Sequence, residues 1–438
     1  MEIFKNIGTP ENPVWEKYSP SKGEGEDSHI EGIETTASGM ASHSEGYSSN
    51  AVGKYSHAEG YKTVAGADSA HTEGFETLAY KYNSHVEGIT SSAASVASRI
   101  QSISGATVTL VGPASQFKTG ENVYLIYDSS GTSLKMKTTV ATILGNNTLV
   151  LNNVPAVSTT PLYLLSTTVN GAPYDGGNHV EGRLNLSKGQ HCHIEGFGNT
   201  DDGYTGTHIM GKHGDANSSY SWFLANGTSP TARGLAAKIL STGQMFADGA
   251  YSSTGADYAE MFEWLDHNPK REDRVGYFVT LDGDKIRKAT LEDDFILGIV
   301  SANPSIIGDN NELNWKGRFI TDEWGRTKYH LVETPPITVE PYGEGQDITK
   351  LVEIIPARVE KHPLINPAWN PDMYYVGREH RPEWSAIGLM GKLLVRDDGS
   401  CQVNGYCRSN DGGIATNCED GFRVMKRISP NIIQVLMR

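Results

Sequence analysis

Seven histidines in the first half of the chain are each followed by one variable residue, a glutamate and a glycine. Imidazole and carboxylate groups are ligands for transition metals, and they also pair with each other through hydrogen bonds. Either chemistry requires that the side chains of successive copies lie close together. The histidines are His29, His43, His57, His71, His85, His179 and His193.

The spacing of these histidines predicts the elements that hold them. Five copies from His29 to His85 follow one another every 14 residues, and His179 and His193 are again 14 residues apart. Such a period is typical of a solenoid, in which each coil buries the face that its neighbour exposes. Fourteen residues allow two strands of about five residues and two tight corners, where glycines are expected. We therefore expect mainly β structure, in a parallel β-roll or β-helix.

The interior of the coils is predicted by the residues between histidine and glutamate. On a strand, residues two apart share one face, and the residue between them points to the other. The intervening residues are small or aliphatic, and a column of alanines repeats in step with them. The predicted interior comprises Ile30, Ser44, Ala58, Thr72, Val86, Val180 and Ile194, with Ala37, Ala51, Ala65 and Ala79.

Large side chains that directly follow the glycines have no room inside so narrow a coil. They are Tyr47, Tyr61, Phe75 and Phe197. Because apolar surface is stabilised by burial, these side chains need a partner outside the coil, and identical chains are the simplest source. We therefore expect a homotrimeric shaft.

The glutamates raise a choice between a metal array and a hydrogen-bonded ladder. Coils about 4.8 Å apart place like charges where they repel by about 3 kcal/mol at an effective dielectric constant of about 20. Each glutamate therefore needs a partner. The histidine two residues away, or one from a neighbouring chain, supplies that partner without a metal. We expect a structural ladder, with no metal and no other cofactor.

The repeat stops between Gly88 and Asn178. Residues 96–170 contain short β-branched and apolar runs separated by turn signals, which predicts five or six antiparallel strands in a small inserted barrel or sandwich. This insertion either presents a binding surface or only stiffens the shaft, and the sequence favours neither. After His193 the repeat decays, and residues 216–256 are expected to form a connector.

The composition excludes several classes of protein. The 438 residues carry a net charge of −15, which argues against nucleic acid and anionic membrane surfaces as partners. The sequence has no run of about 18 apolar residues that would insert into a membrane. The start has no apolar signal-peptide core, so we expect synthesis and assembly in a cytoplasm. The four cysteines are expected to be reduced.

A family resemblance becomes specific after the connector. The run TGADYAEMFEWLDHNPKREDRVGYFVTLDGDKI is followed by FILGIVSANPSIIGDN and later by RPEWSAIGLMGKLLVRDDGSC. These motifs resemble the C-terminal intramolecular-chaperone autoproteolytic domain of phage tailspike and neck-appendage proteins. The resemblance covers residues 254–438, and the SHxEG coils upstream resemble those commonly joined to this domain.

The resemblance implies a domain that helps three shafts to assemble and then cuts itself off, in the manner of a glutamic peptidase. The family cuts before the aspartate of an Asp-x-x-Glu motif. Carried over to this chain, the cut bond joins Ala256 to Asp257, and the catalytic carboxylate is Glu260. The best-known form of the site has a serine where this chain has Ala256, so a mechanism that needs that hydroxyl does not transfer.

The chemistry of two carboxyl groups fits such a cut. Hydrolysis of one peptide bond needs an activated nucleophile and a proton donor, which two carboxyl groups with different pKa values can supply. We expect Asp257 and Glu260 to reach each other across a turn or the first turn of a helix, with Gly255 allowing strained backbone beside the bond. Glu263 and Asp266 are further candidates. The same acidic residues also fit the N-terminal capping of a helix.

The predicted organisation has six segments. They are an N-terminal attachment segment (1–27), β-roll repeats (28–95), the inserted β domain (96–170), resumed repeats (171–215), the connector (216–256) and a β-rich chaperone and protease domain (257–438).

The resemblance implies a structural tail-fibre or appendage protein of a phage or prophage, located in the virion and assembled in the cytoplasm of the bacterial host. Its expected partners are two identical chains, a host-surface receptor and, through the N-terminal segment, other tail or baseplate proteins. The alternatives are a tailspike glycanase with carboxylates along the shaft and a bacterial trimeric surface adhesin.

Overall fold

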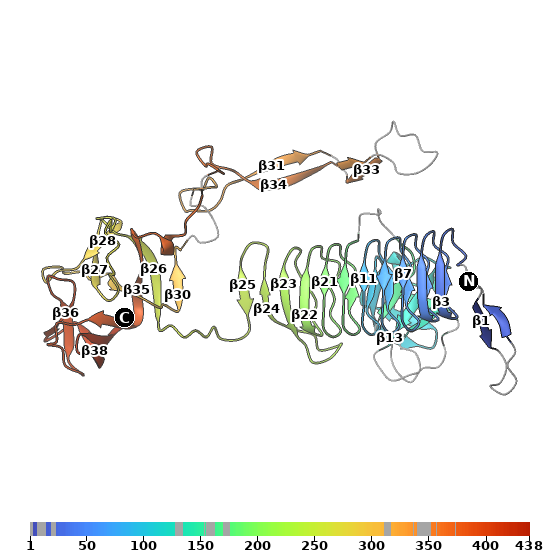
Figure 1. The fold of residues 1–438 in the computed structure, drawn as a ribbon, viewed down its shortest axis with the longest axis horizontal. Helices are drawn as coiled ribbons and strands as arrows, with labels where there is room; N and C mark the ends of the chain where they lie inside the picture. Colours follow the sequence, from blue (N-terminus) through green and yellow to red (C-terminus); the bar gives the residue numbers. More distant parts are fainter. Residues whose placement is uncertain are drawn as a thin grey trace. The chain divides into compact units, whose positions relative to one another are not determined.

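The computed structural model is almost entirely built of β-strands (Figure 1). It describes residues 3–6, 15–18, 23–127, 135–152, 154, 163–169, 176–310, 317–335, 337–339, 352–355, 357–372 and 374–438. Within these ranges the helical elements are two 3₁₀ turns, η1 (Ala114–Gln116) and η2 (Arg378–His380), and no helix is long and apolar enough to cross a membrane. The chain divides into two compact units, Met1–Ala250 and Tyr251–Arg438.

A solenoid forms most of the first unit, and its coils stack through two parallel sheets (Figure 1). Equivalent residues of successive coils pair with each other, so that His43 lies beside His57 and Ala51 beside Ala65. The solenoid predicted from the repeat is therefore confirmed. The first sheet contains β3 (His29–Ile33), β5 (His43–Tyr47), β7 (His57–Ala58), β9 (His71–Thr72), β11 (His85–Val86), β19 (His179–Val180), β21 (His193–Ile194), β22 (His208–Lys212) and β23 (Trp222–Asn226). The second contains β4 (Thr36–Ala37), β6 (Asn50–Ala51), β8 (Val64–Ala65), β10 (Leu78–Tyr80), β12 (Ser92–Ala94) and β20 (Leu186–Ser187).

The interior of the coils follows the predicted small-residue columns. Ala58, Thr72 and Val180 have no exposed surface, and the alanines from Ala37 to Ala79 are equally buried. Most of the coil strands are only two residues long, shorter than the expected five, because the corners take up the rest of each 14-residue coil.

The corners use left-handed backbone at glycine and at other residues. Gly46 has φ 99°, and a Cβ there would lie 2.2 Å from the carbonyl oxygen of Gly60 in the next coil, so only glycine fits. Ser48 and Tyr55 also have φ values of 53° and 58°, and equivalent residues repeat this conformation along the shaft. Each such residue costs about 1 kcal/mol or more, so the stacking of the coils must offset that strain.

The solenoid extends further than the sequence pattern indicated. β22 begins at His208, which is 15 residues after His193 and pairs with it, so one extra residue lies between two coils that remain in register. β23 adds another parallel strand, and β24 (Leu235–Ile239) and β25 (Met245–Ala247) then continue the sheet in antiparallel fashion. The segment expected to be a separate connector, 216–256, thus begins inside the sheet.

The insertion forms a closed six-stranded antiparallel barrel, which is one of the two predicted architectures, a barrel or a sandwich. Its strands pair in the order β13-β14-β17-β16-β15-β18. They are β13 (Ala97–Ser104), β14 (Thr107–Leu110), β15 (Asn122–Ile126), β16 (Lys135–Ile143), β17 (Thr148–Leu151) and β18 (Tyr163–Ser166).

The barrel has its own core and also packs on the shaft. Val108, Leu125 and Leu149 fill its interior without exposed surface. On the shaft side, the rings of Tyr80 and Tyr124 lie 6.3 Å apart. Beyond the barrel the coils resume without a register shift, because His85 pairs directly with His179.

The second unit is a larger mixed sheet with its own core. The main path runs β28-β27-β29-β35-β39-β38-β36-β37, and β26 pairs with both β35 and β30. Phe278, Ile299 and Val435 are fully buried in it, and Trp264 is 1% exposed. The strands are β26 (Asp257–Glu263), β27 (Phe278–Asp282), β28 (Lys285–Lys288), β29 (Gly298–Val300), β30 (Ile306–Gly308), β35 (Trp384–Arg396), β36 (Tyr406–Ser409), β37 (Ala415–Cys418), β38 (Phe422–Ser429) and β39 (Ile432–Met437).

Three two-stranded ribbons lie outside these sheets. β1 (Ile3–Asn6) pairs with β2 (Trp15–Tyr18) in the segment expected to form an attachment region. In the second unit, β31 (Tyr329–Thr334) pairs with β34 (Arg358–Pro363), and β32 (Ile337–Val339) pairs with β33 (Val352–Ile355).

Candidate functional site

The bond between Ala256 and Asp257 lies at the start of a strand. β26 begins at Asp257 and is hydrogen-bonded on both edges, in antiparallel fashion to β35 and in parallel to β30. The expected turn or first helical turn is therefore wrong, and so is the alternative of a helix N-cap. Both rested on a spacing of three residues, which cannot distinguish a helix from a strand without the rest of the sheet.

The two candidate carboxyl groups point to opposite faces of β26. Asp257, Ala259 and Met261 alternate as the buried residues of the strand. Glu260 shares the other face with Tyr258, whose hydroxyl donates a 2.6 Å hydrogen bond to Glu260 Oε1. Because side chains alternate with a period of two, residues three apart diverge. The expectation that Asp257 and Glu260 contact each other is wrong within one chain.

Asp257 is the buried member of this pair. Only 6% of its surface is exposed, and its Oδ2 atom has no hydrogen-bond partner among the described residues. Burial raises the pKa of the Asp257 carboxyl, and a hydrogen bond with Ser301 opposes that shift only in part. The group can therefore hold a proton beside the candidate scissile bond.

Backbone and side-chain donors hold the peptide units around this bond. The Ala256 carbonyl accepts a hydrogen bond from the Lys392 amide at 3.2 Å. Ser305 contacts both flanking carbonyls, since its Oγ donates to Gly255 at 2.6 Å and its amide donates to Asp257 at 2.7 Å. The Ala256 carbonyl is thus already polarised by a donor, as in an oxyanion site.

Two glycines let other segments approach this bond. Gly391 has φ 123°, and a Cβ there would lie 2.4 Å from the carbonyl oxygen of Ala256. Gly255 is not in the left-handed region, contrary to the expectation of strained backbone; it is needed because a Cβ would lie 2.4 Å from the Ser305 amide nitrogen. No role was expected for Ser305, Gly391 or Lys392 from the sequence, although they lie within the runs SANPS and GLMGK that carried the family resemblance.

The two further carboxylate candidates form ion pairs. Glu263 contacts Lys285 Nζ at 2.9 Å, and this interaction lowers the pKa of Glu263. Asp266 contacts Arg274 at 2.6 Å, which lowers the pKa of Asp266 to about 2. Both groups are held ionised by cations, so they suit a structural role better than proton transfer.

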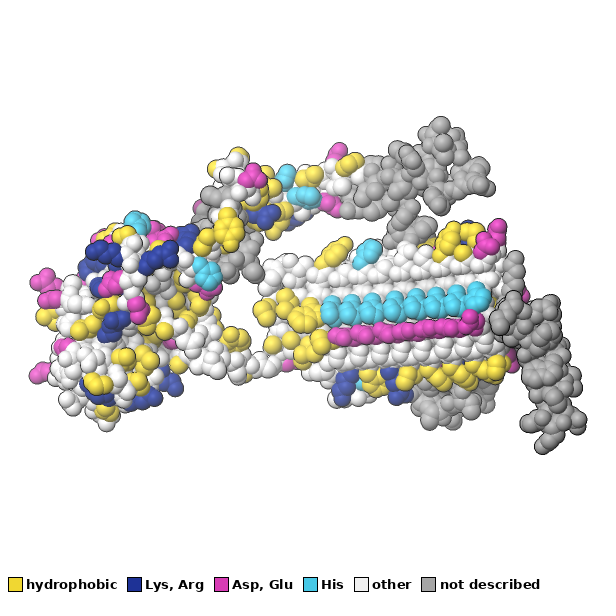
Figure 2. Space-filling model, viewed as in Figure 1, with side chains coloured by type: hydrophobic (Ala, Val, Ile, Leu, Met, Phe, Trp, Pro, Cys, Tyr) yellow, Lys and Arg dark blue, Asp and Glu magenta, His cyan; other side chains and the backbone are white. Residues whose placement is uncertain are grey.

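The repeated histidines and glutamates form a second constellation, on the shaft. Figure 2 shows the histidines as one row with a row of acidic side chains directly beside it. Neighbouring rings from His43 to His208 lie 4.5 to 5.1 Å apart and are stacked. His208 is an eighth member that the sequence analysis missed because of its 15-residue spacing. Its position three residues before a glycine, as in the other copies, was the available signal.

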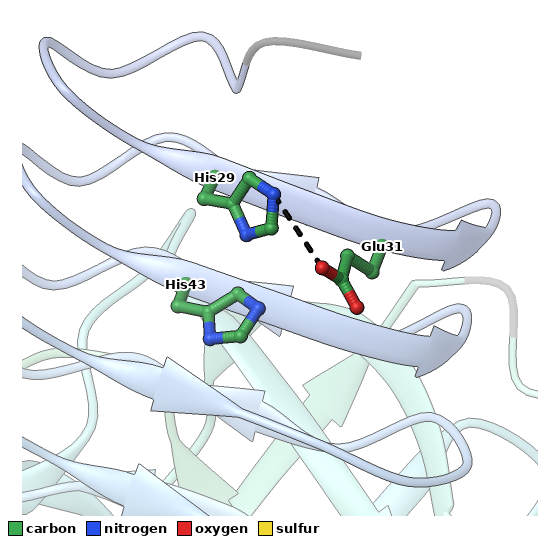
Figure 3. A group of neighbouring side chains, drawn as sticks. All are labelled: His29, Glu31 and His43. Carbon is green, nitrogen blue, oxygen red and sulfur yellow. Dashed lines mark ion pairs between the residues drawn. The ribbon is translucent and has the colours of Figure 1, made fainter. Parts of the chain in front are cut away.

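The contacts differ between the two parts of this ladder. His179, His193 and His208 each bond the glutamate of the preceding coil at 3.1 to 3.3 Å. In the earlier coils the His57, His71 and His85 nitrogens lie 3.7 to 3.9 Å from the preceding glutamate. The first coil differs again, because His29 lies 3.6 Å from its own Glu31 (Figure 3). The usual partner of each glutamate is therefore the histidine of the next coil and not the histidine two residues before it in the sequence.

The charges in the middle of the ladder are strongly coupled. Hydrogen bonds with Glu73 and Glu45 raise the pKa of Glu59 to about 7. Burial, followed by the neighbouring histidines, lowers the pKa of His71. At neutral pH these carboxyl groups therefore share a proton, and the imidazole between them is neutral.

Comparison with known families concerns the part of the chain that contains β26. Residues 219–432 match the model of Peptidase_G2, described as the IMC autoproteolytic cleavage domain. The match confirms the resemblance stated for the C-terminal motifs, and it begins upstream of Thr254, within the end of the solenoid.

Several curated proteins are similar to a part of the chain. The pre-neck appendage protein of Bacillus phage B103 is 35% identical over 179 residues, which are 41% of this chain and 18% of that protein. The pre-neck appendage protein of Bacillus phage phi29 is 31% identical over 178 residues, again 41% and 18%. A putative phage-related protein, YobO of Bacillus subtilis strain 168, is 31% identical over 181 residues, 41% and 20%. The matched segment thus spans about a fifth of each relative.

Two solved structures are similar to the chain. The crystal structure of the pre-mature bacteriophage phi29 gene product 12 has a TM-score of 0.49 and 17% identity, and covers 98% of this chain and 41% of that chain. A C-terminal fragment of the same gene product has a TM-score of 0.32 and 28% identity, with 42% of this chain and all of that fragment covered.

Proposed function

We propose that this chain belongs to a phage or prophage appendage, and that its Peptidase_G2 domain cuts the chain once between Ala256 and Asp257. The observation that carries the proposal is the buried, proton-holding Asp257 at the start of a strand in an autoproteolytic cleavage domain. The domain is then released from a shaft whose assembly it has helped.

In this proposal the two carboxyl groups act from opposite faces of β26. A water molecule attacks the carbonyl carbon of Ala256, and its proton passes through further water on the Tyr258 face to Glu260, which lies four residues along the strand from this carbon. The bond to the nitrogen of Asp257 breaks, and the Asp257 carboxyl gives its proton to this nitrogen. The products are a carboxyl terminus at Ala256 and an amino terminus at Asp257. The amide of Lys392 stabilises the negative charge that develops on the carbonyl oxygen.

The experiment that tests this proposal is a denaturing gel of the purified full chain. Cleavage before Asp257 divides 438 residues into fragments of 256 and 182 residues, and sequencing of the smaller fragment should begin at Asp257. Glu260→Gln should leave the chain whole. Glu263→Gln is the matched control on the same strand, because Glu263 is ion-paired with Lys285 and has no role in the proposed cut. Equal cleavage of both variants would remove Glu260 from the mechanism.

We propose that the shaft assembles as a homotrimer. Support comes from the column that follows the glycines, in which Ile33, Tyr47 and Ile89 remain 63%, 39% and 43% exposed on one chain. Contiguous exposed apolar side chains are typical of interfaces. The Glu260→Gln chain should have three times the chain mass by native mass measurement. A folded monomer would contradict the trimer while leaving self-cleavage untouched.

We propose that the virion uses this appendage to attach to a host-surface receptor, with the N-terminal segment bound to other tail proteins, after assembly in the host cytoplasm. The inserted barrel is the candidate binding head, because it folds around its own core and its first and last strands lie side by side, with Ala97 opposite Leu165. A short Gly-Ser linker in place of residues 96–170 should therefore spare assembly and abolish binding to host cells. Normal binding by that deletion would make the barrel a spacer.

A further inference from the structure

The ladder contains enclosed imidazole nitrogens that the hydrogen bonds of the shaft do not use. The Nε2 atoms of His43, His57, His71 and His85 are shielded from solvent and have no hydrogen-bond partner among the described residues. Buried polar atoms without partners are rare, because each costs about 1–3 kcal/mol. All four lie in the coils before the barrel, whereas His179, His193 and His208 are hydrogen-bonded to glutamate.

The carboxylate oxygens beside these nitrogens are arranged as a ligand set. His57 Nε2 lies 3.8 Å from Glu45 and 3.9 Å from Glu59, almost midway between the two. These distances are too long for a hydrogen bond. Two ligands each about 2.1 Å from a tetrahedral Zn²⁺ lie about 3.4 Å apart. The two histidine–glutamate distances exceed that spacing by about 0.5 Å, so a bound ion would draw the three groups closer together.

Five groups of this kind follow one another along the described shaft, and in two of them every histidine has an enclosed Nε2 atom without a hydrogen-bond partner. The donor atoms of Glu45, His57 and Glu59 lie within 4.8 Å of one another, and so do those of His71, Glu73 and His85. A groove of about 560 Å³, lined by the glutamates and the glycine column, adjoins both sets and gives an ion a route from solvent. Water from this groove can supply the fourth ligand of a tetrahedral site.

We propose that the coils from His43 to His85 bind two divalent transition-metal ions of the Zn²⁺ class, one at Glu45, His57 and Glu59 and one at His71, Glu73 and His85. Imidazole together with carboxylate favours Zn²⁺ over Mg²⁺, which prefers six oxygen ligands. The ions link adjacent coils, so the metal stabilises a stack whose narrow core consists mainly of small side chains. This binding is independent of the self-cleavage proposed for the second unit.

The test is a calorimetric titration of the tag-free full chain, freed of metal with a chelator, with Zn²⁺ and separately with Mg²⁺. We expect two Zn²⁺ ions per chain, no saturable binding of Mg²⁺ and a higher unfolding temperature with Zn²⁺. Glu59→Gln should lose one of the two ions, or weaken that site about tenfold or more. Because the amide keeps the shape and removes one of three adjacent acidic groups, the metal-free shaft should remain folded.

Glu26→Gln is the control, since Glu26 is exposed on the first coil and lies outside the ladder. It should bind two ions like the parent. The proposal is overturned if the parent shows no saturable Zn²⁺ binding, or if Glu59→Gln binds as much Zn²⁺ as the parent and the control. A purely structural ladder predicts either of those outcomes.

Discussion

The solenoid and the C-terminal unit are both built of strands, yet they place their polar residues in different ways. In the shaft, one coil repeats the contacts of the last, so His43, His57 and His71 have equivalent surroundings. In the C-terminal unit, the groups around Ala256 come from separate segments, with Ser305 before β30 and Lys392 within β35. The same histidine and glutamate contacts therefore recur along the shaft, whereas the groups around Ala256 form a single site.

This difference predicts how each unit responds to change. A repeat array gains stability from each coil and from each interface between neighbouring coils. The loss of one coil therefore removes only the stability that this coil and one interface contribute. A single site loses its function with any of its groups.

Asp257→Asn should slow self-cleavage by about a hundredfold or more, because general acid catalysis contributes about 10²–10⁴-fold. The amide preserves the size of the buried side chain and removes its transferable proton. The measurement is the fraction of intact chain on a denaturing gel over time. Cleavage at the parental rate would show that the burial of Asp257 is only structural.

Ala58→Phe should destabilise the shaft by about 1–3 kcal/mol or more, because overpacking of a filled interior displaces its neighbours. Ala58 has no exposed surface and lies between Ser44 and Thr72 in adjacent coils. Thermal unfolding of the first unit, residues 1–250, reports the effect. Val52→Phe, at an exposed position in the second coil, is the control and should leave the unfolding temperature nearly unchanged.

The rate of self-cleavage should fall as the pH rises through the raised pKa of Asp257. The acid form is the proton donor, so activity is present below that pKa and lost above it. The descending limb should lie above the ordinary aspartate value of about 3.9. Time courses with uncut chain, purified from a slowly cleaving variant, measure the limb. A rate that does not change with pH would exclude Asp257 as the donor.

Ser305→Ala should slow cleavage by roughly fivefold to tenfold, since one hydrogen bond contributes about 1 kcal/mol. The change removes the 2.6 Å bond to the Gly255 carbonyl, while the backbone amide still holds Asp257. The same gel assay measures it. An unchanged unfolding temperature of the C-terminal unit would separate a positioning effect from a loss of fold.

Deletion of one whole coil, residues 42–55, should have the smallest effect. The deletion joins Ala41 to Ser56 and keeps the next histidine in register, because Ser42 and Ser56 are equivalent. We expect a folded shaft with a loss of about 1 kcal/mol, or about 2–4 °C in unfolding temperature. Circular dichroism measures both the β structure and the unfolding temperature of the deletion variant. Loss of all β structure would show that the coils are not interchangeable.

The sequence predicted the shaft well because its information is repeated. The buried column from Ser44 to Ile194 and the pairing of equivalent residues follow from one period and from strand alternation. The 14-residue period missed only His208, because one additional residue precedes it. His208 still pairs with His193.

The site at β26 was predictable only in part. The positions of Asp257 and Glu260 came from the family motif, but their opposite orientations depend on pairing with β30 and β35, far along the chain. Ser305 and Lys392 reach the bond through that same pairing. The family motif therefore identified the residues, and only the sheet shows the faces on which they act.

The barrel inserted between two coils has a consequence for the order in which the chain folds. His85 pairs with His179, which lies 94 residues further along the chain. Closing that loop from the unfolded chain costs about 2 kcal/mol more entropy than closing an ordinary 14-residue coil. A barrel that has already formed removes most of this cost, because its first and last strands are neighbours and bring the two coil ends together. A folded barrel therefore favours the pairing of the two coils that flank it, so the shaft should grow across this point more readily once the barrel has formed.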